Sequence, residues 1–199
     1  MARGVKGLAA VVGLAVGLSV LAMSPAGTQR STGMAEQSSH GNLVVDGSRH
    51  VADATDRMIV ESRIVPATPA ECWARWTTGQ GVAGFMSKHN SIELRIGGPY
   101  EVYFAMQLPE GLRGSEDCRI LSYLPERMLS FEWNAPPTFP EIRQERSRVV
   151  VLFEPVEGGT KVELTHLGFG RGKQWDQVYA YFTKAWPRVM DGFAMLAEA

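Results

Sequence analysis

The chain has 199 residues, of which 45% are hydrophobic and 21% are charged. This balance is typical of a globular protein and excludes disorder over the whole length. Lys and Arg number 20 and Asp and Glu number 21, so the formal net charge is −1. A nearly neutral chain has no long-range field that would gather nucleic acid or anionic lipid, so neither is an expected partner.

The first 26 residues have the three parts of a secretory signal peptide. Arg3 and Lys6 precede an apolar run from Leu8 to Met23, and Ser24-Pro25-Ala26 follows it. We therefore expect residues 1–26 to direct export, to the medium or the cell envelope, and the mature chain to have no membrane span. A chain that instead begins at Met34 would be cytoplasmic.

Residues 27–56 are polar and aperiodic, so they are interpreted as a flexible linker before a domain at residues 57–199. Residues 57–65 are rich in β-branched side chains and stop at Pro66, which is typical of a strand. Thr68, Pro69 and Glu71 have the types and spacing of a helix start. This helix is expected to end at Gly79, and residues 82–86 predict a second short helical segment.

From Ile92 onwards the apolar pattern has a period of two, which predicts antiparallel strands over residues 92–96, 100–106, 118–123, 128–134, 146–154 and 160–167. From Trp175 to Phe193 the apolar residues recur at steps of three and four, which predicts a long amphipathic helix. Pro187 is expected to bend this helix or to loosen one turn. The order predicts an α+β fold in which the last helix covers the apolar face of the sheet.

Short motifs recur along residues 58–193 in an order typical of a known family. They are Pro69, Trp73, Trp76 and Thr77; Gly97-Gly98 and Tyr100; Gly114 and Ile120; Pro125, Leu129, Phe131 and Trp133; and Gly158-Gly159-Thr160 followed by Val162, Leu164, Thr165-His166 and Gly168-Phe169. With a Trp-bearing last helix, the domain resembles the START-like (SRPBCC) superfamily, and within it the AHSA-type branch, which is named for an activator of the Hsp90 ATPase. The chain departs from that pattern at Phe85-Met86, where family members often carry paired aromatics including Trp.

The resemblance implies a helix-grip fold, in which a curved antiparallel sheet wraps around the long C-terminal helix and two short helices follow the first strand. It also implies a hydrophobic cavity, so the expected function is binding of a small hydrophobic molecule by a monomer or weak homodimer. The alternatives are a polyketide cyclase-like or hydrolase-like enzyme that uses the same cavity, and a co-chaperone-like domain that activates an ATPase. Large side chains can also fill the space completely and leave no cavity.

By alternation and helical spacing, a group of mostly aromatic side chains points between the sheet and the last helix. The candidate ligand-binding residues are Trp76, Phe85, Tyr103, Trp133, His166, Tyr179, Phe182 and Trp186. His166 is the single candidate for general acid or base catalysis. The sequence supplies no recognisable partner to orient its ring, so a structural role is favoured and the protein is expected to be a binder rather than an enzyme.

The remaining polar residues point to no further site. Cys72 and Cys118 lack the spacing of a zinc site and are interpreted as buried thiols, with a disulfide as the alternative in an exported chain. The histidines outside the strands lie in polar surroundings, so no metal and no cofactor are expected. Two charged groups are expected to be solvated: Glu116, Asp117 and Arg119; and Glu141, Arg143, Glu145 and Arg146.

Overall fold

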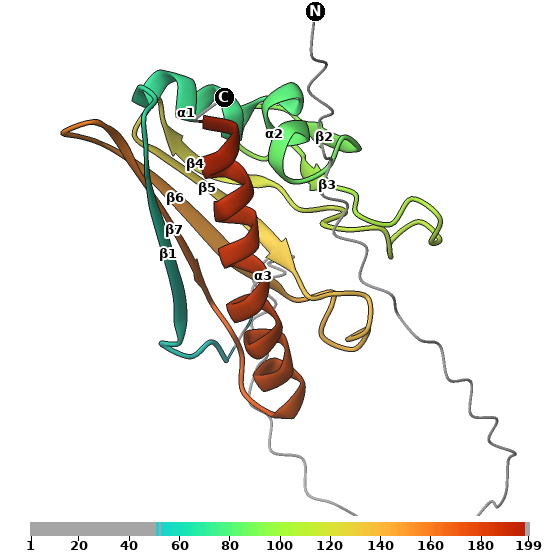
Figure 1. Ribbon diagram of the computed structural model, residues 1–199. Helices are drawn as coiled ribbons and strands as arrows, with labels where there is room; N and C mark the ends of the chain where they lie inside the picture. The colour runs from blue at the N-terminus through green and yellow to red at the C-terminus, as the bar shows by residue number, and fades with distance from the viewer. Residues whose placement is uncertain (1–50, 52, 198–199) are drawn as a thin grey trace, which may run out of the picture. The chain divides into compact units, whose positions relative to one another are not determined.

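The computed structural model describes residue 51 and residues 53–197, which form a five-stranded sheet, a two-stranded sheet, two short helices and one long helix (Figure 1). In chain order the elements are β1 (Met58–Val65), α1 (Pro69–Thr77), α2 (Gly79–Phe85), β2 (Asn90–Ile92), β3 (Tyr100–Val102), β4 (Ile120–Leu124), β5 (Met128–Asn134), β6 (Arg146–Val156), β7 (Gly159–Leu167) and α3 (Lys173–Ala197). The predicted signal peptide and most of the predicted linker lie outside the described residues.

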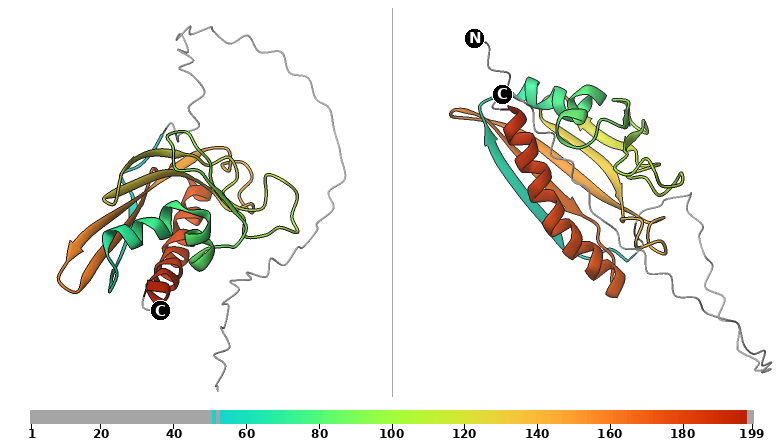
Figure 2. Two further views of the ribbon diagram at one scale, coloured as in Figure 1. Left: turned by 90° about the horizontal axis from the view of Figure 1, so that it is seen from above. Right: turned by 45° about the vertical axis from the view of Figure 1, so that its right-hand side comes forward.

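Five strands form one antiparallel sheet in the order β1-β7-β6-β5-β4, and β2 and β3 form a separate two-stranded sheet. Figure 2 shows the larger sheet curving around α3, which lies across its inner face. The register of β4 against β5 shifts between Ile120 and Ser122, as expected where a strand bends. The α+β helix-grip fold predicted from the sequence is therefore confirmed.

Apolar side chains on the inner face of the sheet form the core with α3. The inward positions of β6 illustrate the alternation, since Val149, Val151 and Phe153 are all buried. α3 contributes its stripe from the other side, and Met190 and Phe193 are fully buried. Burial of this stripe stabilises a 25-residue helix more than its intrinsic propensity does.

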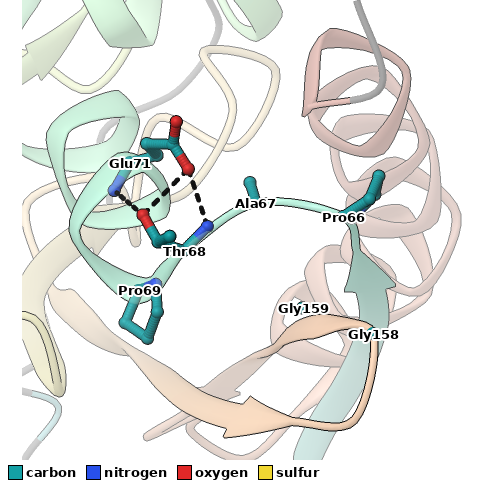
Figure 3. A pocket seen from close by; sticks show the side chains of 7 residues that line it. All are labelled: Pro66, Ala67, Thr68, Pro69, Glu71, Gly158 and Gly159. Atoms are coloured by element: carbon teal, nitrogen blue, oxygen red, sulfur yellow. Dashed lines mark hydrogen bonds between the residues drawn. The ribbon is translucent and has the colours of Figure 1, made fainter.

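The connection from β1 to α1 is fixed by a capping box. The Thr68 side chain accepts a hydrogen bond from the backbone N–H of Glu71 at 3.2 Å, and the Glu71 carboxylate accepts one from the backbone N–H of Thr68 at 2.7 Å (Figure 3). These hydrogen bonds, the backbone one first, lower the pKa of the Glu71 carboxyl group. The predicted helix start is confirmed.

Replacement of Thr68 by Ala is expected to lower the free energy of unfolding by about 1 kcal/mol, because the Glu71 backbone N–H loses the hydroxyl oxygen that accepts its hydrogen bond. Urea unfolding followed by circular dichroism measures this loss. Thr68→Ser keeps the hydroxyl group and should retain most of the stability. A Ser variant as unstable as the Ala variant would show that the threonine methyl group, and not the capping box, stabilises this turn.

The strands before β4 are shorter than the alternation predicts. β2 ends at Ile92, and Leu94 and Ile96 are exposed, so the predicted strand over residues 92–96 is wrong beyond its first residue. The chain turns there because the Gly98 N–H donates to the Arg95 carbonyl oxygen at 2.8 Å. β3 ends at Val102, which leaves Phe104 and Met106 on an exposed loop.

α3 continues from Lys173 to Ala197 through Pro187, although the proline lacks the N–H that a helix interior uses.

The end of the predicted linker packs against the domain. Val51 is buried, and Thr55 donates both its backbone N–H and its hydroxyl group to the Phe169 carbonyl oxygen. Within residues 53–197, no helix combines the length and the hydropathy that crossing a bilayer requires.

Candidate functional site

The candidate site is the space between the inner face of the sheet and α3. The helix approaches β1 and α2 closely. Towards the middle of the sheet, large aromatic side chains from both layers meet one another. We describe these side chains as two groups, the central cluster (Trp133, His166, Phe182 and Trp186) and the Trp76 cluster (Trp76, Phe85 and Phe193).

The central cluster joins two strands to two successive turns of α3. The ring centroids of Trp133 and Trp186 are 5.4 Å apart, and those of His166 and Phe182 are 4.8 Å apart. Phe182 and Trp186 stack at 6.0 Å. All four side chains are buried, with exposed fractions of 5% or less. The structure therefore brings together four of the eight residues predicted from the sequence.

The Trp76 cluster lies at the other end of α3, where α1 and α2 cover the helix. The Trp76 ring centroid is 4.9 Å from that of Phe85 and 5.7 Å from that of Phe193. Phe85 is half-buried, whereas Trp76 is fully buried. The two clusters are linked along the sheet, because Phe131 contacts Trp133 and stacks on Tyr100, whose hydroxyl group donates to the Trp76 carbonyl oxygen at 3.0 Å.

The two predicted tyrosines lie apart from these clusters. Tyr179 is half-buried near the start of β1, where its hydroxyl group donates to the Met58 carbonyl oxygen at 3.2 Å and its ring packs edge-on against Phe169. Tyr103 follows β3 and donates to the carboxylate of Glu101, in polar surroundings. Partial burial, more than the nearby Glu101, raises the pKa of Tyr103. Tyr179 lies on α3, as predicted, but its ring packs on Phe169 outside the two clusters.

His166 is held by hydrogen bonds at both ring nitrogens. Trp186 Nε1–H donates to His166 Nδ1 at 2.8 Å, so the ring proton lies on Nε2, 2.7 Å from Ser147 Oγ. Ser147 in turn donates to the Trp133 carbonyl oxygen at 3.0 Å. This chain of hydrogen bonds joins α3 to β7, β6 and β5, and it satisfies every buried polar atom that takes part.

Burial lowers the pKa of His166 to about 3, so the ring is neutral at physiological pH. A neutral ring with both nitrogens occupied has no lone pair with which to take a proton from a substrate. The geometry thus favours the structural interpretation of His166. The partners that orient the His166 ring were not identified from the sequence. Ser147 could have been found, because it shares the inner face of β6 with Val149 and Val151, and a polar residue on an apolar face indicates a buried hydrogen bond.

Phe104 is a further neighbour that the sequence did not single out. It lies on the loop after β3, is 55% exposed, and meets Trp133 edge-on at 6.5 Å. Trp133 is nearly buried and contacts Trp186 on its other side. Phe104, Trp133 and Trp186 therefore form a continuous aromatic path from solvent to the centre of the site.

One polar atom of the site differs from the others. Trp76 Nε1 is buried, and no hydrogen-bond acceptor among the residues described here reaches it. Leaving a buried donor without a partner costs about 1–3 kcal/mol. The indole of Trp186 on α3, by contrast, donates to His166, so these two tryptophans have opposite hydrogen-bonding states.

The expectation of solvated charges is wrong for three residues beside the site. Arg143, Arg146 and Glu116 have exposed fractions of 4%, 3% and 9%. Glu116 and Arg143 form an ion pair at 3.5 Å that joins the loop after β3 to the loop after β5. Sequence reasoning missed this pair because the two loops are distant in sequence and meet only through the fold.

Two surface hollows occur elsewhere on the described residues. The first has a volume of about 320 Å³ and lies between the start of α1 and the turn before β7 (Figure 3). Its Glu71 carboxylate is already engaged in the capping box. The second, of about 310 Å³, is lined by Glu101, Tyr103, Arg113 and Glu116 among others. Neither hollow is lined by a residue of the two clusters.

Among the described residues, metal-ligating side chains and cysteines provide no second candidate site. Among residues 53–197, no three His, Cys, Asp or Glu side chains converge in a way that suits a metal ion. Cys72 and Cys118 are buried thiols, which confirms the interpretation made from the sequence.

Comparison with solved structures shows where this arrangement recurs. Protein MLL2253 from Mesorhizobium loti superposes with a TM-score of 0.57 at 21% identity, over 70% of this chain and 96% of that one. The Aha1 dimer from Colwellia psychrerythraea gives 0.56 at 16% identity, over 71% and 96%. CalU16 from Micromonospora echinospora gives 0.50 at 20% identity, over 71% and 75%. At such identities the likeness shows the fold alone.

No curated protein sequence matches the chain. The family described as "Activator of Hsp90 ATPase homolog 1-like protein" matches residues 66–198, which include both clusters and the whole of α3. The motifs around Trp76, Trp133 and His166 therefore lie within the matched region. The chain belongs to this family, a branch of the SRPBCC superfamily.

Proposed function

We propose that the protein binds a small apolar molecule between the sheet and α3, in the space lined by the central cluster and the Trp76 cluster. The observation that carries the proposal is the aromatic path from the exposed Phe104 through Trp133 to Trp186. Phe104 differs from a singly exposed apolar side chain because its ring contacts Trp133 and so continues inward to buried rings, as at the mouth of an apolar binding site.

The side chains of the site can make room for a ligand by turning. The helix is held to the centre of the sheet through ring contacts and the His166 hydrogen bonds, and aromatic rings contribute area with few rotatable bonds. An apolar ligand that replaces ring–ring contacts with ring–ligand contacts keeps the apolar surface out of water. In this proposal the contacting rings represent the closed state of the site.

The proposal favours a binder over a cyclase-like or hydrolase-like enzyme. Such chemistry needs a proton acceptor in the site, and the neutral, doubly hydrogen-bonded His166 is unsuited to that role. Together with export, which the first 26 residues predict, the proposal describes a carrier or scavenger of an apolar molecule outside the cytoplasm.

The test is a fluorescence titration with 2-ethylnaphthalene, a small apolar probe, combined with native mass spectrometry for bound molecules. We expect saturable quenching of tryptophan emission with one probe per chain. Phe104→Ala should weaken binding about tenfold, because a rim aromatic contributes about 1–1.5 kcal/mol. Phe104 is exposed, so this variant should fold normally.

Met195→Ala is the matched control, since Met195 is 71% exposed and lies on α3 away from the buried stripe. It should bind as the wild type does. Quenching that never saturates, or an equal loss in both variants, would mean that the two clusters are only a core.

A further inference from the structure

The buried indole N–H of Trp76 indicates which chemical class of ligand would suit the site. Trp76 is fully buried between the rings of Phe85 and Phe193, which offer no acceptor atom. The nearby Tyr100 hydroxyl group is oriented to donate to the Trp76 carbonyl oxygen, not to receive from the indole. Within residues 53–197, the Trp76 N–H has no partner.

Buried donors in folded proteins nearly always have a partner, which is a protein group, an ordered water molecule or a ligand. A phenylalanine at position 76 would fill a similar apolar space without leaving a donor unsatisfied. An indole at this point thus fits a site in which the acceptor arrives with a bound molecule.

We propose that the ligand has an apolar body and one uncharged hydrogen-bond acceptor, a carbonyl or ether oxygen, which accepts from Trp76 Nε1–H. This inference rests on the proposed function and specifies its ligand class. Pure hydrocarbons bind less tightly, because they leave the indole unsatisfied. Charged molecules are excluded, since the Phe85 and Phe193 rings offer no counter-ion and burial of a charge is costly.

Phe85 provides the access to this donor. It is the last residue of α2, is half-buried, and contacts both Trp76 and Phe193. We expect the Phe85 side chain to turn aside when a ligand enters, since it is the more exposed of the two rings packed on Trp76.

The test uses two probes of nearly equal shape, 2-acetylnaphthalene and 2-ethylnaphthalene, which differ in one carbonyl oxygen. The affinity ratio of the two probes is measured for the wild type, for Trp76→Phe, and for the control Trp73→Phe. Trp73 lies on the same helix but packs against Tyr123 and Phe153. We expect Trp76→Phe to lower the preference for the acetyl probe at least fivefold and Trp73→Phe to leave it unchanged.

The indole N–H signals of the five tryptophans provide a direct reading by ¹H–¹⁵N NMR. The Trp76 signal, assigned by its loss in Trp76→Phe, should move downfield with 2-acetylnaphthalene and not with 2-ethylnaphthalene. If both probes bind while this signal stays in place or the ratio is unchanged, the inference fails and the proposed function stands. If neither probe binds, both fail. A signal already downfield in the free protein shows a water partner and overturns the inference.

Discussion

Acidification from pH 7 to pH 4 is expected to lower the free energy of unfolding by about 3 kcal/mol through His166 alone. Burial lowers the pKa of His166 from its usual 6.5 to about 3 in the folded protein. Between these two values the unfolded chain binds a proton that the folded chain does not. Stability is therefore complete above pH 6.5 and falls by about 1.4 kcal/mol per pH unit towards pH 3.

Urea unfolding at half-unit steps between pH 4 and pH 8 measures this slope. Carboxyl groups also contribute on the acid side, so the readout is the difference between the wild type and His166→Gln. The glutamine variant should be less stable at pH 7, because it loses part of the hydrogen-bond chain from Trp186 to Ser147, but flatter in its dependence on pH. The two curves should converge towards pH 4.

His89→Gln is the matched control, because His89 is an exposed histidine in the loop before β2. It should reproduce the wild-type slope. Parallel curves for the wild type and His166→Gln would show that His166 titrates with an ordinary pKa, and therefore that the hydrogen bonds around its ring open readily. That result would reopen the general-base interpretation of His166.

Periodicity was sufficient to predict the fold because each layer of a helix-grip domain has a simple apolar repeat. β5 shows which burial this alternation predicts correctly and which it misses. Leu129, Phe131 and Trp133 are buried on the inner face, as the alternation predicts. Glu132 and Asn134 on the opposite face are buried as well, because the loop after β3 covers them and accepts a hydrogen bond from Asn134 at the Gly114 carbonyl oxygen.

The residue types of the candidate site could be predicted from the sequence, but the hydrogen bonds among them could not. Trp133, His166, Phe182 and Trp186 come from three elements, and their apolar spacing alone brings them to one place. The bond from Trp186 to His166 depends on the rotation of α3 about its own axis, which a repeat of three and four residues fixes only to within tens of degrees. Hydrogen-bond partners within a cluster are therefore set by the tertiary structure and not by the spacing of the residues.

Loops were the least predictable part, since their charges compensate one another through long-range contacts. Glu116 looked like one of two adjacent solvated carboxylates. Instead it accepts backbone N–H groups of Gly111 and Arg113 at 2.8 and 2.7 Å, and it faces Arg143. The neighbouring Asp117 is exposed, as expected. Adjacent acidic residues can thus have opposite environments, and no local rule distinguishes them.

Replacement of Arg143 by Met is expected to lower the free energy of unfolding by about 3–5 kcal/mol, because it leaves the buried Glu116 carboxylate without its cation. The guanidinium group also donates to three carbonyl oxygens, those of Gly111 at 2.8 Å, Gly114 at 2.6 Å and Ala135. These atoms belong to the two loops that flank the exposed end of the aromatic path. Loss of Arg143 should therefore loosen the loop that carries Phe104.

Urea unfolding of Arg143→Met, Glu116→Gln and the double variant separates the ion pair from the other contacts. The double variant should be more stable than the sum of the single losses predicts, because it leaves no unpaired charge behind. Arg127→Met, an exposed arginine in the turn between β4 and β5, should change stability by less than about 0.5 kcal/mol. Additive losses would show that Glu116 and Arg143 act independently. Under the proposed function, Arg143→Met should also weaken 2-ethylnaphthalene binding, but by no more than Phe104→Ala does, since it loosens the loop and keeps the Phe104 ring.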